Sequence, residues 1–312
     1  MIKRRSCLMI LILLFFLAAT MTLQACHQED SHAEIQEEKL IGHIELPGSQ
    51  GNHKEEGSHI SAATSTSQSA THTADKPSAP EEIQTKLPDF SKYSNIKEKK
   101  KAFFDFLRPI VRAKNKKVLQ ERAYVLKQWQ LFKQGHDLPD QDIEKLNSLA
   151  DRYRVNATYA DGKEFFKDLL IHIDKIPVSL ALIQAAKESG WGTSYFARKG
   201  NNLFGQWCFK KGCGIVPRKR PQGASYEVQA FENVGQSVRV YIQNLNSHPA
   251  YKKLRQERYQ MRLAGKEPNA HLMAGGLEKY SAMGKQYVET VRQMIQGNKK
   301  FMGIHESEAV SS

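Results

Sequence analysis

Cysteine is scarce in this chain, with 4 cysteines in 312 residues. Two of them, Cys7 and Cys26, lie in the first 26 residues, so only Cys208 and Cys213 remain for the folded part. A structural zinc site requires four ligands, and no histidine or further cysteine lies near this pair. We expect a disulfide that closes the small loop 209–212 if the compartment is oxidising, with two free thiols as the alternative.

The sequence also lacks an apolar run of membrane-spanning length. The apolar segment 8–19 follows three basic residues at 3–5, and it is shorter than the roughly 20 residues that cross a bilayer. This pattern predicts a secretory signal rather than a transmembrane anchor. Residues 1–25 are therefore interpreted as a signal peptide.

The signal ends in Leu23-Gln24-Ala25-Cys26, which resembles the lipobox of bacterial lipoproteins. The resemblance implies cleavage before Cys26 and a lipid on its sulfur. His27 in place of Asp after this cysteine favours the outer over the inner membrane. The predicted location is therefore periplasmic and lipid-anchored. The alternative is an ordinary signal peptide that leaves Cys26 free.

The segment 26–90 contains no aromatic residue until Phe90, and its apolar residues show no sustained periodicity. Residues 27–90 contain 12 acidic and 4 basic residues. They also contain 6 of the 11 histidines, and we interpret these histidines as solvated rather than metal-binding. Such a segment cannot bury a core. We expect a flexible acidic tether with a root-mean-square span of roughly 40–50 Å.

In residues 91–312, acidic residues are fewer than basic residues. The net charge of +13 includes +3 from the signal and −8 from residues 27–90, which leaves +18 on residues 91–312. Such a charge attracts polyanionic partners. Export and the lack of a recognisable module argue against nucleic acid, which leaves anionic lipid head groups or peptidoglycan with its peptide carboxylates.

Residues 91–312 show a mostly helical pattern. Apolar residues recur at helical spacing over 103–111, 119–132 and 143–149, which predicts a helical subdomain over 91–158 packed on a catalytic domain over 159–298. Residues 299–312 are expected to form a flexible tail. The fold class is therefore mainly α (α+β).

The central prediction is a helix over 177–189. Its small apolar stripe suits close packing on neighbouring helices, and Pro177 and Gly190 suit its start and end. Glu188 lies about 60° from Ala185 around the helix axis, at the edge of the buried face. The helix dipole and partial burial beside Trp191 are both expected to raise the pKa of Glu188. A protonated carboxyl group of this kind suits the acid that glycosidic cleavage requires.

Two segments extend this interpretation, PVSLALIQAAKESGWGTSYFARKGNNLFGQWCFKKGCG and YEVQAFENVGQSVRVYIQNLNSHPAYKKLR. They closely resemble the bacterial Bax-like branch of the glucosaminidase family, which includes the peptidoglycan-hydrolysing domain of the flagellar rod-assembly protein. The resemblance is strong over about 160–297. It implies a lysozyme-like helical domain with a small β-lobe across a substrate groove. It also implies cleavage of the β-1,4 bond after N-acetylglucosamine in peptidoglycan.

The resemblance assigns Glu188 as the catalytic acid. It assigns the turn at Asn201, Asn202, Leu203, Phe204 and Gly205 to the shaping of the groove. The β-lobe is expected over about 214–231, and Glu227 is the candidate second carboxylate, with a solvent-facing strand residue as the alternative. If no second carboxylate lies close, the acetamido group of the substrate is the expected assistant.

The further candidate residues are aromatic. Tyr280 matches a tyrosine that lines the family's catalytic centre, although the segment 280–283 lacks the family's Asp. Trp191, Phe204 and Trp207 are candidates for stacking on sugar faces, with core packing as the alternative. Tyr287 is predicted as core, and the helix over 233–246 as scaffold.

The expected function is that of an endo-β-N-acetylglucosaminidase that acts on peptidoglycan strands as a monomer, with no metal or cofactor. A muramidase or lytic transglycosylase that uses the same Glu188 is one alternative. A non-catalytic wall-binding lipoprotein, retained by its positive charge, is the other.

Overall fold

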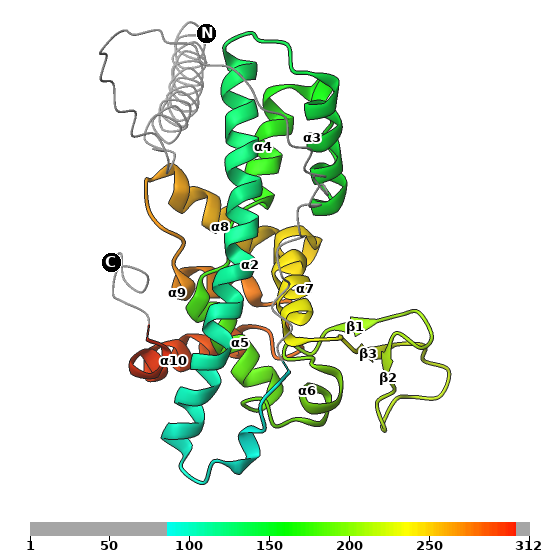
Figure 1. Cartoon of the computed structure of the whole chain (residues 1–312), viewed down its shortest axis with the longest axis vertical. Coiled ribbons are helices and arrows are strands. Elements are labelled where there is room, and N and C mark those ends of the chain that lie inside the picture. Colours follow the sequence, from blue (N-terminus) through cyan, green and yellow to red (C-terminus); the bar gives the residue numbers. More distant parts are fainter. Residues whose placement is uncertain (1–85, 304–312) are drawn as a thin grey trace, which may run out of the picture.

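The computed structural model describes residues 86–303. The signal peptide, the lipidation site at Cys26 and nearly all of the tether lie outside these residues. The described part is mainly helical with one small antiparallel sheet, which confirms the predicted fold class (Figure 1). Within residues 86–303, no helix combines the length and apolar character needed to cross a membrane.

The elements follow one another along the chain in the following order. They are η1 (Phe90–Lys92), α2 (Ile96–Lys133), α3 (Asp140–Tyr153), η2 (Tyr159–Asp161), α4 (Lys163–His172), α5 (Val178–Ser189), α6 (Tyr195–Gly200), β1 (Trp207–Cys208), β2 (Gly214–Ile215), β3 (Glu227–Gln229), α7 (Val234–Ser247), η3 (Pro249–Tyr251), α8 (Lys252–Leu263), α9 (Ala270–Met273), η4 (Ala274–Leu277) and α10 (Lys285–Met302).

Helix α2 is the longest helix of the described residues, and α4, α5, α7 and α10 pack along it (Figure 1). Its apolar residues at helical spacing, such as Phe103, Leu107 and Val111, are fully buried. One hydrophobic core runs from Phe90 to Met302. The expected subdomain boundary near residue 158 therefore does not divide the core, because α2 supplies one wall for the helices that follow it.

The folded part extends beyond both of its predicted ends. Phe90, placed in the tether, is 1% exposed and packs edge-on against Phe103 at a ring distance of 5.3 Å. At the other end, α10 continues through residues 299–302, and the Met302 carbonyl accepts a hydrogen bond from Arg108 Nε at 2.6 Å. Long-range contacts with α2 therefore order residues whose local sequence resembles that of a linker.

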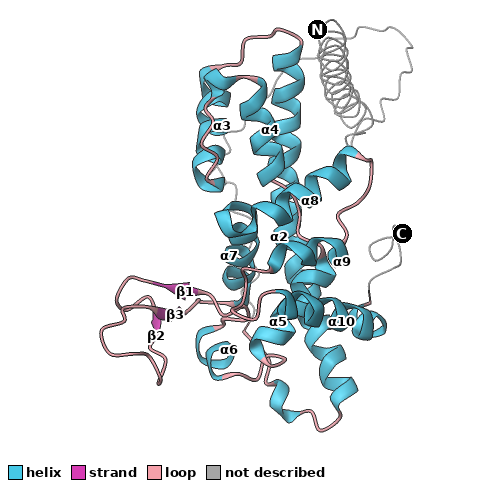
Figure 2. Ribbon diagram, turned by 180° about the vertical axis from the view of Figure 1, so that it is seen from behind, coloured by secondary structure: helices cyan, strands magenta, loops and turns pink. Residues whose placement is uncertain are grey.

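A small lobe projects from the helical body between α6 and α7 (Figure 2). Its three strands are ordered β1-β3-β2, and both pairings are antiparallel. The strands are only two or three residues long. The lobe begins at Trp207, somewhat before the predicted start at residue 214.

Candidate active site

Helix α5 places Glu188 in its last turn. The helix ends at Gly190, whose φ of 58° is left-handed and whose N–H donates to the Ala186 carbonyl. Residues 179–186 are all buried, whereas Glu188 is half-buried at the edge of that face. The carboxyl group therefore lies where the buried helix reaches the surface, as its position in the sequence predicts.

The electrostatic surroundings favour the protonated form of Glu188. Burial raises its pKa and is the dominant influence, while a hydrogen bond from the Tyr287 hydroxyl and the charge of Lys187 partly oppose it. Tyr287 donates to Glu188 Oε1 at 2.9 Å. The direction of the pKa shift agrees with the prediction from sequence.

A chain of hydrogen bonds leads to this carboxyl group from the core. The Tyr241 hydroxyl donates to Gln184 Oε1 at 2.7 Å, and Gln184 Nε2 donates to the Tyr287 hydroxyl oxygen at 3.0 Å. Since Gln184 fills an acceptor position of Tyr287, the Tyr287 hydrogen is directed to Glu188. The chain joins α7, α5 and α10 at one point and fixes which oxygen of Glu188 accepts.

Further tyrosines surround this chain. Tyr280 stacks on Tyr287 at a ring distance of 5.4 Å, and its hydroxyl donates to the Phe204 carbonyl at 2.9 Å. The ring centres of Tyr251 and Tyr280 are 6.0 Å apart. Burial raises the pKa of Tyr251 to about 12 and that of Tyr280 well above its usual value. These hydroxyls therefore stay protonated at neutral pH.

The turn at 201–205 is organised by its two asparagines. Asn201 adopts a left-handed φ of 50°, and its amide donates to the Phe231 carbonyl at 2.9 Å. Asn202 is buried, donates to the carbonyls of Gln206 and Gln229, and accepts from two backbone N–H groups of the turn. Both amides are thus engaged by the protein itself and hold the shape of the turn.

This turn lies against Glu188. Gly205 has a φ of 66°, and a Cβ added there would lie 4.0 Å from Glu188 Oε2. A side chain at this position would therefore meet the carboxyl group in addition to straining the backbone. The turn thus places bare backbone beside the oxygen of Glu188 that Tyr287 does not contact.

The three candidate stacking residues have different surroundings. Trp191 packs edge-on against Phe104 of α2 at a ring distance of 5.3 Å, with Lys100 Nζ 5.0 Å from its ring. Phe204 is 2% exposed and stacks on Tyr241 at 3.9 Å. Trp207 is 52% exposed. Trp207 is the most exposed of the three, although Tyr226 stacks on one face of its ring at 4.2 Å, and core packing accounts for Phe204.

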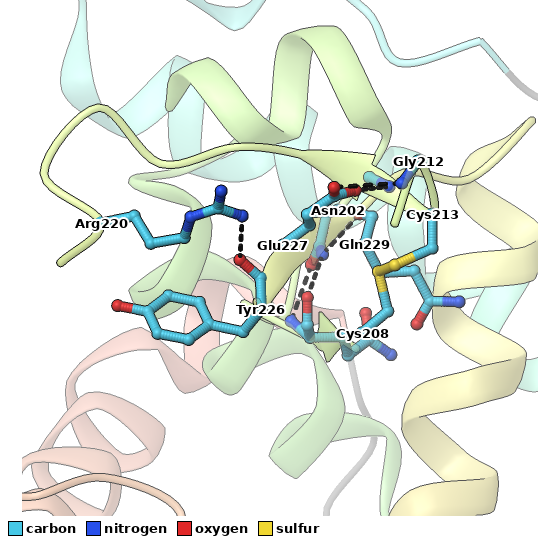
Figure 3. The surroundings of a disulfide bond; sticks show 10 residues. Asn202, Cys208, Gly212, Cys213, Arg220, Tyr226, Glu227 and Gln229 are labelled. Atoms are coloured by element: carbon cyan, nitrogen blue, oxygen red, sulfur yellow. Dashed lines mark hydrogen bonds between the residues drawn. A yellow bond between two sulfur atoms is a disulfide. The ribbon is translucent and has the colours of Figure 1, made fainter. Parts of the chain in front are cut away.

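Glu227, the candidate second carboxylate, points into the lobe (Figure 3). Its oxygens accept the backbone N–H groups of Gly212 at 3.0 Å and Gly214 at 2.8 Å. These bonds hold the Glu227 pKa below its usual value. Glu227 is 4% exposed, and both of its carboxylate oxygens support the backbone of the loop.

A disulfide joins Cys208 to Cys213 beside Glu227 (Figure 3). The two sulfurs and a Glu227 oxygen lie within 4.8 Å of one another, as three metal ligands would. Sulfurs joined in a disulfide offer no thiolate to a metal ion, so this cluster does not fit a zinc site. The loop 209–212 is instead closed covalently at its ends.

Comparison with known proteins shows the family of the chain. Residues 163–300 match the Glucosaminidase family, described as mannosyl-glycoprotein endo-beta-N-acetylglucosaminidase. The protein Bax of Escherichia coli (strain K12) is 38% identical over 220 residues, which cover 70% of this chain and 77% of that protein. No solved structure matches the chain. The chain therefore belongs to the glucosaminidase family, as a Bax-like member with the fold of a glycoside hydrolase.

Proposed function

We propose that this protein is an endo-β-N-acetylglucosaminidase that cleaves the β-1,4 bond after N-acetylglucosamine in peptidoglycan, with Glu188 as general acid. The observation that carries the proposal is the half-buried Glu188 carboxyl group at the end of α5, whose pKa burial raises. A carboxylic acid with a raised pKa keeps its proton to higher pH and can give it to the leaving oxygen.

The proton to be transferred is assigned to Oε2 of Glu188. Oε1 accepts the Tyr287 hydrogen, whereas Oε2 lies on the side of Gly205. A proton on Oε2 leaves the Tyr287 bond intact in both states of the carboxyl group. The glycosidic oxygen is therefore expected to approach past the bare backbone of Gly205.

The acetamido group of the substrate is the nucleophile of the first step. Both oxygens of Glu227 accept backbone N–H groups of the lobe, so this carboxylate is engaged there. As the C1–O bond breaks, the acetamido oxygen bonds to C1. The Glu188 carboxylate then removes a proton from the water that opens this ring, and the configuration is retained.

The compartment and substrate follow from charge and from the N-terminal motif. Export with a lipid on Cys26 would hold the enzyme at the periplasmic face of the outer membrane. The net charge of +18 on residues 91–312 favours a wall polymer that carries carboxylates. The exposed ring of Trp207 supplies a surface for a sugar face.

Digestion of purified peptidoglycan tests the proposed function. New reducing N-acetylglucosamine ends, first formed as the β-anomer, are the expected products. Reducing or anhydro muramic acid would instead identify a muramidase or a lytic transglycosylase. Binding without new chain ends would identify a wall-binding protein, and an α-anomer would exclude the acetamido route.

Replacement of Tyr287 by phenylalanine is expected to move the alkaline limb of the pH–rate profile to higher pH. The Tyr287 hydrogen bond stabilises the carboxylate and so lowers the Glu188 pKa. Its loss raises that pKa further, and the acid stays protonated to higher pH. Tyr280→Phe is the matched control, because its hydroxyl donates to the Phe204 carbonyl and its loss should leave the limb in place. A limb that moves to lower pH in Tyr287→Phe would contradict this assignment.

A further inference from the structure

The tip of the β-lobe carries an exposed surface of cations and apolar side chains, here called the lobe surface. Its cations are Lys210, Lys211, Arg218 and Lys219, all exposed. Its apolar members are Trp207, Phe209 and Val216, which are 52%, 73% and 50% exposed. Exposed apolar side chains that cluster among charges are typical of binding sites.

The lobe itself, residues 205–231, offers no free acidic group to the cations of the lobe surface. Glu227 is the one acidic residue between positions 205 and 231, and its oxygens accept the N–H groups of Gly212 and Gly214. Arg220 turns inward and donates to the Tyr226 carbonyl at 3.1 Å. The four exposed cations therefore face solvent with their charge unpaired by the lobe itself.

Several links hold the loops beneath the lobe surface, among them the disulfide and the hydrogen bonds of Glu227 (Figure 3). The Cys208–Cys213 disulfide and Glu227 fix the loop that bears Phe209, Lys210 and Lys211. The second loop is fixed by the Arg220 bond and by Tyr226, which stacks on Trp207 at a ring distance of 4.2 Å. A surface already ordered before binding loses less conformational entropy when a ligand binds.

The lobe surface begins next to Glu188. Gly205 lies beside Glu188 Oε2, and Trp207 follows two residues later, within about 7 Å along an extended chain. Lys210 and Lys211 lie only a few residues beyond. A polymer bound at Glu188 therefore reaches the lobe surface within a short distance.

We propose that the lobe surface binds the carboxylate-bearing peptides attached to the glycan, so that peptide-bearing strands are preferred over bare glycan. This inference rests on the proposed function, since it assumes a peptidoglycan strand at Glu188. The ring of Trp207 supports a sugar, while the lysines and arginine pair with the peptide carboxylates. The short path from Gly205 favours the strand over an anionic membrane as the partner.

The test compares two substrates and two variants. One variant changes Lys210, Lys211, Arg218 and Lys219 to glutamine, and the matched control changes four exposed lysines elsewhere to glutamine, Lys97, Lys117, Lys127 and Lys299. Sedimentation with intact sacculi and with glycan stripped of peptides by an amidase measures binding, in a Glu188→Gln background. We expect the preference for peptide-bearing strands to fall about tenfold in the lobe variant, a change of about 1.4 kcal/mol.

The control variant should keep the preference for peptide-bearing strands. High salt should weaken this preference in the protein whose lobe surface is unchanged. An equal loss of binding to both substrates, or an unchanged preference in the lobe variant, would overturn the inference. Loss of binding to vesicles that contain anionic lipid, with the preference retained, would overturn it in favour of a membrane surface. Because binding is measured without cleavage, failure of the proposed reaction would appear separately, as absent chain ends with unmodified protein.

Discussion

Replacement of Glu188 by glutamine is expected to reduce peptidoglycan cleavage by about 10²–10⁴-fold, the range for loss of a positioned general acid. Glutamine has nearly the same shape, and its amide oxygen can still accept the Tyr287 hydrogen bond. The protein should therefore keep its fold and its binding of glycan. The measurement is the rate of appearance of new reducing ends, together with the unfolding midpoint as a check of stability.

Glu227→Gln provides the comparison for this prediction. Its oxygens accept the N–H groups of Gly212 and Gly214, and glutamine keeps one acceptor oxygen, so we expect less than about a tenfold loss of rate. A loss as large as that for Glu188→Gln would make Glu227 the second catalytic carboxylate. The acetamido route would then be wrong. If Glu188→Gln alone left the rate unchanged, the acid itself would be misassigned.

Replacement of Arg258 by methionine is expected to lower the free energy of unfolding by about 3–5 kcal/mol, as for other broken buried ion networks. Arg258 is fully buried in α8. Its guanidinium group donates to Asn246 Oδ1 and to the backbone carbonyls of four residues just before α5, namely Ile171, His172, Asp174 and Lys175. Methionine would leave these five acceptors buried without this donor.

The same network holds a buried carboxylate. Burial alone would raise the Asp174 pKa, but Arg122 and Arg262 outweigh it and hold that pKa well below its usual range. Arg262 bonds both Asp174 oxygens, at 2.9 Å and 3.1 Å. The loop that leads into α5 is thereby fixed by α2 and α8, so Arg258→Met should disturb the helix that carries Glu188.

Urea denaturation measures the loss of stability in Arg258→Met. Arg292→Met is the matched control, because Arg292 is partly exposed and pairs with the exposed Glu289, and such surface pairs contribute about 0–1 kcal/mol. An Arg258→Met protein no less stable than the Arg292→Met control would show that the buried network does not stabilise the fold.

The local part of the site could be predicted from sequence. The apolar stripe of α5, the glycine at its end and the position of Glu188 on the last turn depend on residues within a few helical turns. For the same reason the helix over Lys163–His172 and the short strand at Glu227–Gln229 were predictable. In each case the side-chain pattern itself specifies the backbone.

The partners of Glu188 could not be predicted, because they come from distant parts of the chain. Tyr287 lies 99 positions away and was interpreted as core, which matches its burial but misses its hydroxyl. Gln184 offered a signal, since an amide inside an otherwise apolar buried helix requires hydrogen-bond partners. The sequence gives no comparable signal for Tyr241, which is an aromatic residue on a helix interpreted as scaffold.

The aromatic residues show the same limit. The sequence around Trp191 and Phe204 suggests a sugar platform, but α2 covers Trp191 and α7 covers Phe204. Which aromatic ring stays open depends on packing between elements far apart in sequence. Trp207 remains exposed because the short strands of the lobe project from the helical body.

A direct titration of Glu188 tests the central claim, that burial raises the pKa of this carboxyl group and that the Tyr287 hydrogen bond partly opposes the rise. The protein is labelled with ¹³C at glutamate Cδ, and the Glu188 signal is assigned by its absence from the Glu188→Gln spectrum. The account predicts a pKa above the value of about 4.3 for an unperturbed glutamate, and a higher one still in Tyr287→Phe. A Glu188 pKa at or below that ordinary value would contradict it.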